Sequence, residues 1–296
     1  MDLAEVLTRA LGAPVTVHGT TRNEHQSTFD SRIVDCDAGG ERLELLVKWG
    51  TTRSGSGHGH RGGVTREAET YRELLAPFGL GPRFFGAVED GESTWLVLER
   101  LPNATQLVSA DESGLVSAAR WAGEFHARNE GAQPPHLPVY DREYYIAWAR
   151  RARELWSGSV EGVEPACARF ETSVDVLLAA PQTVIHGELG PENVLVDGED
   201  LYPVDWESAA VGPGEVDLAL LIQDWPEPWR SDAIRAYQAA RWPAGSPAEH
   251  GDAFNAADLY WLMRWLGDAE LWRTEPDPPG QAAVLLAEHD ARERVS

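Results

Sequence analysis

The feature that most constrains this 296-residue chain is a short hairpin inside a region that is otherwise helical. Two apolar runs, NVLV at 193–196 and LYPVDW at 201–206, flank DGED, whose glycine suits a tight turn. They are the only strong strand signals after residue 110, where apolar residues recur at helical spacing. An antiparallel hairpin places the start of its first strand beside the end of its second, so we expect Asn193 and Asp205 to be neighbours.

The first third of the chain has a different pattern. Alternating apolar residues and Gly-containing turns predict strands over 14–20, 27–36, 41–49, 82–90 and 93–101. Apolar residues at helical spacing predict helices over 2–11, 64–76, 111–129, 141–157, 164–180, 215–223, 230–241 and 252–272. A β-rich first part followed by a helical remainder predicts an α+β fold.

Composition excludes several classes of protein. The net charge of −23 argues against nucleic-acid binding, which normally needs a basic face. It is compatible with a cationic ligand, although charge alone favours acids that simply solvate the surface. The sequence has no apolar run long enough for a membrane span and no basic region typical of a signal peptide. The only two cysteines, Cys36 and Cys167, lie far apart, which favours buried thiols and a cytoplasmic location.

The basic residues are unevenly chosen. The chain has 25 lysines and arginines, and Lys48, at the end of the apolar run LELLVKW, is the only lysine. Lysine and arginine are not interchangeable where a compact point charge is needed. Lys48 is therefore a candidate functional residue before any motif is considered.

The hairpin also has the composition of a metal site. The amide oxygen of Asn193 and the carboxylate of Asp205 suit Mg²⁺, which prefers oxygen ligands and keeps several waters. Glu188 lies in the loop just before the first strand, so its carboxylate is expected to reach the same site. There it could take a proton from an attacking hydroxyl. Asn and Asp are also common turn residues, so the interpretation depends on all these residues converging.

Five candidate residues occur along the chain in the same order as the functional residues of a kinase-like phosphoryl-transfer site. They are Lys48, Glu67, Glu188, Asn193 and Asp205. Five segments together resemble the aminoglycoside phosphotransferase and choline kinase branch of the protein-kinase-like fold. They are VIHGELGPENVLV, VDWESAAVGPGEVDLALL, LLVKWG, REAETYREL and AGEFHAR. The resemblance covers roughly residues 40–222.

The resemblance implies a two-lobed fold, with a nucleotide-binding lobe at 1–101 and a helical lobe at 102–296. It implies that Lys48 contacts the phosphates of ATP or GTP and that Glu67 orients Lys48. Asn193 and Asp205 would hold Mg²⁺. Glu99 and Leu101, in the linker after the fifth strand, are included among the nucleotide-binding candidates. His186 and His126 are expected to be structural, and Asp217 to brace the hairpin or cap a helix.

Glu188 departs from this pattern, because the family has Asp at that position. Its side chain is one methylene longer, and a displacement of about 1 Å can cost on the order of 10²-fold in rate. Three outcomes are open: the loop retreats to compensate, the enzyme is slow, or phosphate transfer is lost. Gly187, Gly190 and Pro191 would permit an altered loop path.

The sequence therefore predicts Mg²⁺-dependent phosphorylation of a hydroxyl on a small molecule, such as an aminoglycoside-like antibiotic, an amino sugar or a related metabolite. The alternatives are a nucleotide-binding regulatory module and, less compatible with the motifs, nucleotidyl transfer. Acids and aromatic residues over 252–272, with Tyr144 and Tyr145, could line a pocket for a cationic acceptor or belong to a solvated face and a core. The Gly- and Ser-rich segment 50–63 lacks a Walker A ending and follows the lysine strand, so it is not expected to cover the phosphates. The resemblance implies loop 19–28 for that position, although it has only one glycine.

Overall fold

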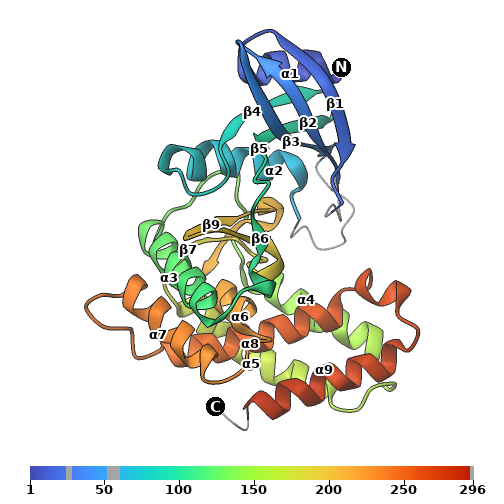
Figure 1. The fold of residues 1–296 in the computed structure, drawn as a ribbon. Coiled ribbons are helices and arrows are strands. Elements are labelled where there is room, and N and C mark those ends of the chain that lie inside the picture. The colour runs from blue at the N-terminus through green and yellow to red at the C-terminus, as the bar shows by residue number, and fades with distance from the viewer. Residues whose placement is uncertain (25–28, 52–60, 294–296) are drawn as a thin grey trace. The chain divides into compact units, whose positions relative to one another are not determined.

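The computed structural model describes residues 1–24, 29–51 and 61–293 (Figure 1). Most of segment 50–63 and the end of loop 19–28 lie outside the described residues. Packing divides the chain into two compact units. Unit 1 contains Met1–Gly114, Pro134–Pro138 and His186–Ala209, and unit 2 contains Leu115–Gln133, Val139–Ile185 and Ala210–Ser296. The lobe boundaries expected at 1–101 and 102–296 remain a prediction.

Unit 1 is built on an antiparallel sheet with strand order β1-β2-β3-β5-β4 (Figure 1). Its strands are β1 (Val15–Arg22), β2 (Asp30–Ala38), β3 (Glu41–Thr51), β4 (Phe84–Asp90) and β5 (Ser93–Glu99). The helix α1 (Leu3–Leu11) is capped by Asp2, whose side chain accepts a hydrogen bond from the Glu5 N–H, and it packs Val6 and Leu7 into the sheet's apolar core. The strands and this helix agree with the sequence prediction.

Two further parts of unit 1 carry candidate residues. The helix α2 (Gly63–Thr70) continues through a π-helical turn, Tyr71–Leu75, and a short 3₁₀ turn, Ala76–Phe78. The predicted hairpin is present as β8 (Val194–Asp197) and β9 (Asp200–Pro203), with the two-residue strand β6 (Thr105–Gln106) beside β8.

Unit 2 is mainly helical, with one two-stranded sheet. Its helices are α3 (Glu112–Arg128), which enters unit 2 at Leu115, α4 (Arg142–Trp156), α5 (Val163–Ala179), α6 (Glu215–Ile222), α7 (Trp229–Arg241), α8 (His250–Gly267) and α9 (Pro278–Glu293). The strands β7 (Gln182–Ile185) and β10 (Ala210–Pro213) pair antiparallel. The α+β class expected from the sequence is confirmed. Among the described residues, no helix combines the length and apolar character needed to cross a bilayer.

The sequence prediction missed four elements, and the structure decides between the two alternatives that the sequence left open for Tyr145. The strands β6, β7 and β10 have at most four residues, and the buried stripe of α9 is narrow, with Ala282, Leu286 and His289. Tyr145 is buried in the core of unit 2, where its ring packs edge-on against Phe170 and Tyr260, so it is not a pocket-lining residue. Cys36 and Cys167 are both buried free thiols.

Candidate functional site

Lys48 lies on β3 between two carboxylates from distant parts of the sequence. Its Nζ is 2.7 Å from Oε2 of Glu67 on α2, and it also forms an ion pair and hydrogen bond with Oδ1 of Asp205. Glu67 is 2% exposed and Lys48 14%. Burial alone would lower the pKa of the Lys48 ammonium, but the charges of Glu67 and Asp205 outweigh it and raise that pKa. The ammonium therefore stays charged.

The hairpin places Asp205 beside Asn193, as the sequence predicts. Val194 pairs with Pro203, and the Val204 N–H donates to the Asn193 carbonyl oxygen at 2.9 Å. Asp205 follows in the left-handed region, with φ 66° and ψ 54°, and is the only non-glycine residue with positive φ among those described. Such a backbone costs on the order of 1–3 kcal/mol and is typical of functional sites.

The loop carrying Glu188 is attached to this hairpin through backbone contacts. His186 donates from Nε2 to the Val204 carbonyl at 2.8 Å, and its Nδ1 accepts from the Glu188 N–H at 3.3 Å. The amide of Asn193 donates to the Glu188 carbonyl at 2.9 Å, which leaves its Oδ1 available for a ligand. Gly187 has φ 81°, a conformation that favours glycine. His186 is thus a structural loop residue, as expected.

Arg61 is a site residue that the sequence interpretation missed. Its Nη2 lies 3.4 Å from Oε1 of Glu188, and its Nε lies 3.8 Å from Oε1 of Glu207. The N–H of the next residue, Gly62, donates to the Glu207 carbonyl at 2.8 Å, which fixes the backbone beside Arg61. No local signal distinguishes Arg61 from the other arginines, because only the fold brings it to Glu188.

Among the described residues, the ion pairs of this site join two cations to four carboxylates. Lys48 pairs with Glu67 and Asp205, and Arg61 pairs with Glu188 and Glu207. Burial, and then the neighbouring Asp205 carboxylate, raise the pKa of Glu207 to about 7. Within the described chain, the buried Oε2 of Glu207 has no hydrogen-bond partner.

These observations fit a divalent cation. A bound ion would offset the excess of carboxylates, and the oxygens of Asn193 and Asp205 are suitable ligands. Among the described residues there is no group of three His, Cys, Asp or Glu side chains that could hold a metal alone. The remaining ligands would thus be water or phosphate oxygens, as Mg²⁺ prefers.

Glu99 and Leu101 form hydrogen bonds with residues outside this cluster. Glu99 ends β5, and its side chain accepts from the Arg83 N–H at 3.1 Å. The carbonyl of Leu101 accepts from the Ala104 N–H at 3.4 Å. Their role in nucleotide binding remains a prediction.

His126 and Asp217 form a separate buried pair in unit 2. His126 Nε2 is 3.1 Å from Oδ2 of Asp217, and its Nδ1 is 3.0 Å from the Tyr237 hydroxyl. Burial, only partly offset by Asp217, lowers the pKa of His126. Both side chains are at most 1% exposed, which agrees with the structural role expected for His126.

Comparison with known proteins gives a consistent result. Residues 57–251 match the model of the "Phosphotransferase enzyme family". This range includes Glu67, Glu188, Asn193 and Asp205, whereas Lys48 precedes it. The chain is 28% identical over 159 residues to viomycin phosphotransferase of Streptomyces vinaceus, covering 48% of this chain and 54% of that protein.

It is also 27% identical over 189 residues to N-acetylmuramate/N-acetylglucosamine kinase of Pseudomonas aeruginosa, covering 60% of this chain and 53% of that protein. The match thus spans about half the length of each of these curated relatives. Among solved structures, a thermostable mutant of aminoglycoside phosphotransferase APH(4)-Ia, in ternary complex with ADP and hygromycin B, has a TM-score of 0.62 and 17% identity, covering 99% of this chain and 98% of that one. At this identity the likeness shows a shared kinase-like α+β fold.

Proposed function

This chain belongs to the phosphotransferase enzyme family, and from that premise we propose that it transfers the γ-phosphoryl group of ATP or GTP to a hydroxyl of a small molecule. The observation that carries the proposal is the position of the only lysine, held between Glu67 and Asp205. An ammonium on a sheet strand, kept charged by two neighbouring carboxylates, suits the negative charge of nucleotide phosphates.

In this proposal, Lys48 binds the phosphates and Glu67 holds its ammonium in place. The 2.7 Å contact with a nearly fully buried carboxylate fixes the side-chain conformation before substrate arrives. Nucleotide binding then does not have to include the entropy cost of ordering the lysine side chain. Glu99 and Leu101 are proposed to contact the nucleotide as well.

Asn193 and Asp205 would hold Mg²⁺, with Glu207 close enough to assist. When bound, the ion would neutralise charge on the transferred phosphoryl group and on the leaving nucleotide. The left-handed backbone at Asp205 and the hydrogen bond from Asn193 to the Glu188 loop keep both oxygens oriented for this task.

Glu188 is proposed to orient the acceptor hydroxyl and take its proton as the oxygen attacks the γ-phosphorus. The bond from that phosphorus to the β–γ bridging oxygen breaks, and the nucleoside diphosphate leaves. Arg61 is proposed to hold the longer side chain in position, because it contacts a glutamate oxygen that an aspartate would not extend to. The Glu variant of the loop would then be an adapted site rather than a broken one.

The acceptor is proposed to be an antibiotic, an amino sugar or a related hydroxylated metabolite. Support comes from the names of the relatives, a viomycin phosphotransferase and an N-acetylmuramate/N-acetylglucosamine kinase. One observation favours a second function, a nucleotide-binding module without turnover. The Arg61 guanidinium already pairs with the carboxylate that would accept the proton.

Mass spectrometry of the products separates these functions. The protein is incubated with ATP or GTP, Mg²⁺ and a panel of aminoglycosides, peptide antibiotics and amino sugars. An acceptor that gains one phosphate while the nucleotide becomes a diphosphate supports the kinase. Gain of a nucleoside monophosphate overturns it in favour of nucleotidyl transfer. Saturable nucleotide binding with no product from any acceptor supports the module.

A further inference from the structure

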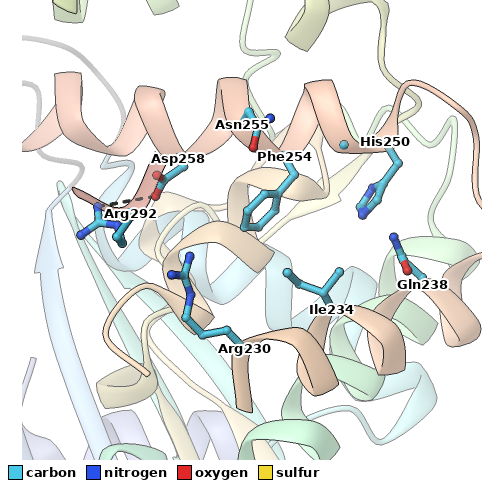
Figure 2. Close-up of a pocket in the computed structure, with 9 residues that line it drawn as sticks. Arg230, Ile234, Gln238, His250, Phe254, Asn255, Asp258 and Arg292 are labelled. Carbon is cyan, nitrogen blue, oxygen red and sulfur yellow. Dashed lines mark ion pairs between the residues drawn. The ribbon is translucent and has the colours of Figure 1, made fainter. Parts of the chain in front are cut away.

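A second candidate site lies entirely within unit 2. A cavity of about 460 Å³ opens between α7, α8 and α9 (Figure 2). This volume is in the range that small-molecule ligands occupy. Figure 2 shows Arg230, Asp258 and Arg292 at one end of the cavity, Ile234 and Phe254 in the middle, and His250 and Gln238 at the other end.

One end of the cavity has a surplus of positive charge. Asp258 is neutralised by α9, because its Oδ2 is 3.2 Å from Nε2 of His289 and its Oδ1 is 3.7 Å from Nη2 of Arg292. Burial raises the pKa of Asp258, but His289, Arg292 and Arg230 outweigh burial and lower that pKa, so the carboxylate stays ionised.

Arg230 is the second guanidinium at this end. Its Nε is buried and has no hydrogen-bond partner among the described residues, and its charge acts on Asp258 together with those of His289 and Arg292. One carboxylate thus faces two guanidinium groups, so this end of the cavity keeps a net positive charge that a ligand anion would balance.

The opposite end provides a different chemistry. The Nδ1 of His250 is 2.8 Å from Oε1 of Glu215, so it donates a hydrogen bond to this carboxylate. The Nε2 of His250 is buried and has no hydrogen-bond partner among the described residues, and the whole side chain is 5% exposed. An unpartnered ring nitrogen beside the amide of Gln238 suits a ligand hydroxyl, which can both donate and accept a hydrogen bond.

We propose that this cavity binds a small anionic, hydroxylated molecule of the sugar-acid or sugar-phosphate class. The carboxylate or phosphate would pair with Arg230, the carbon chain would contact Phe254 and Ile234, and a hydroxyl would reach His250 Nε2. The charge is opposite to that of the cationic acceptor that the acids of α8 suggest in the sequence. The inference does not depend on the proposed phosphotransfer, because its residues are all in unit 2.

Isothermal titration calorimetry of the whole protein tests the site with D-gluconate, glucose 6-phosphate, D-glucose and glucosamine. Saturable binding of at least one of the two anions, at least about tenfold tighter than glucose and weakened by added salt, is expected. Binding of the carboxylate alone or the phosphate alone would distinguish a sugar-acid site from a sugar-phosphate site. Glucose or glucosamine binding as tightly as both anions would overturn the proposal, and so would no binding of either anion.

Variants of α7 make the test specific. Arg230→Gln should weaken the bound anion at least about tenfold, and Arg230→Lys should give an intermediate affinity, because it keeps the charge but loses the planar fork. Arg235→Gln is the matched control, since Arg235 is exposed on the same helix and pairs with Asp232. Unchanged affinity in Arg230→Gln, with unfolding temperature and nucleotide binding equal to the original protein, would refute the assignment.

Discussion

The Nζ of Lys48 lies 2.7 Å from Oε2 of Glu67, a carboxylate that is 2% exposed. Lys48→Arg keeps the charge but places a wider, planar group where a point charge fits between two carboxylates. We expect kcat/KM for nucleotide to fall at least about 100-fold, or about 2.7 kcal/mol of transition-state stabilisation. Arg42→Lys, on the same strand and in an exposed pair with Asp35, is the control for an arginine–lysine exchange and should leave activity unchanged. A fully active Lys48→Arg enzyme, measured by product formation, would remove the basis of the proposed function.

We expect activity to depend on both the charge and the length of the side chain at position 188. Glu188→Gln removes the proton acceptor and should lower kcat at least about 100-fold. Glu188→Asp introduces the aspartate that the resembling family has at this position, but it withdraws the carboxylate by about 1 Å. We therefore expect kcat to fall about 10- to 100-fold. Glu192→Gln, on an exposed neighbour in the same loop, is the control. If Glu188→Asp equals or exceeds the original rate in single-turnover assays, the loop is shaped for aspartate and the adaptation proposed here is wrong.

Arg61 should act through Glu188. We expect Arg61→Gln to lower kcat about tenfold while nucleotide affinity changes little, and Arg72→Gln, on the exposed face beyond α2, to have no effect. In a double-mutant cycle, Arg61→Gln should cost little more once Glu188→Asp is present, because the contact is already lost. Additive losses would contradict the positioning role. A rise in activity in Arg61→Gln would instead support a guanidinium that blocks the carboxylate.

Metal dependence can be read from stability as well as from turnover. Mg²⁺ and nucleotide together should raise the unfolding temperature, and chelation with EDTA should abolish both this shift and activity. Asp205→Asn and Asn193→Ala should lose most of the Mg²⁺-dependent shift. Asp197→Asn, at the turn of the same hairpin, should keep it. An unchanged shift in both site variants would place the metal elsewhere.

The buried His126–Asp217 pair predicts a pH dependence of stability. Burial lowers the pKa of His126 in the folded state below its ordinary value of 6.5. Below that value the unfolded chain binds a proton that the folded chain resists, so the free energy of unfolding falls as pH decreases, by up to about 1.4 kcal/mol per unit for this group. His126→Asn should be less stable at pH 8 and lose part of this slope. Urea unfolding between pH 5 and 8 measures both, and identical slopes would show that His126 does not contribute.

How much of the site could be predicted depended on how local each signal was. Asn193 and Asp205 could be paired because a tight hairpin fixes their neighbourhood, and Lys48 stood out as the only lysine. Arg61 could not be found, because its partners lie 127 residues or more away and nothing in its own neighbourhood marks it. The pairing of β7 with β10 was missed for a related reason, since four-residue strands carry little periodicity.

The positive φ of Asp205 has a consequence for how libraries of variants are interpreted. Asparagine and glycine tolerate this backbone, whereas valine, isoleucine or threonine would force the turn after β9 to rearrange. A deep mutational scan at this position would therefore report two losses at once, of ligand chemistry and of local shape. Comparing asparagine with glycine, both of which accept the geometry, would isolate the chemical part.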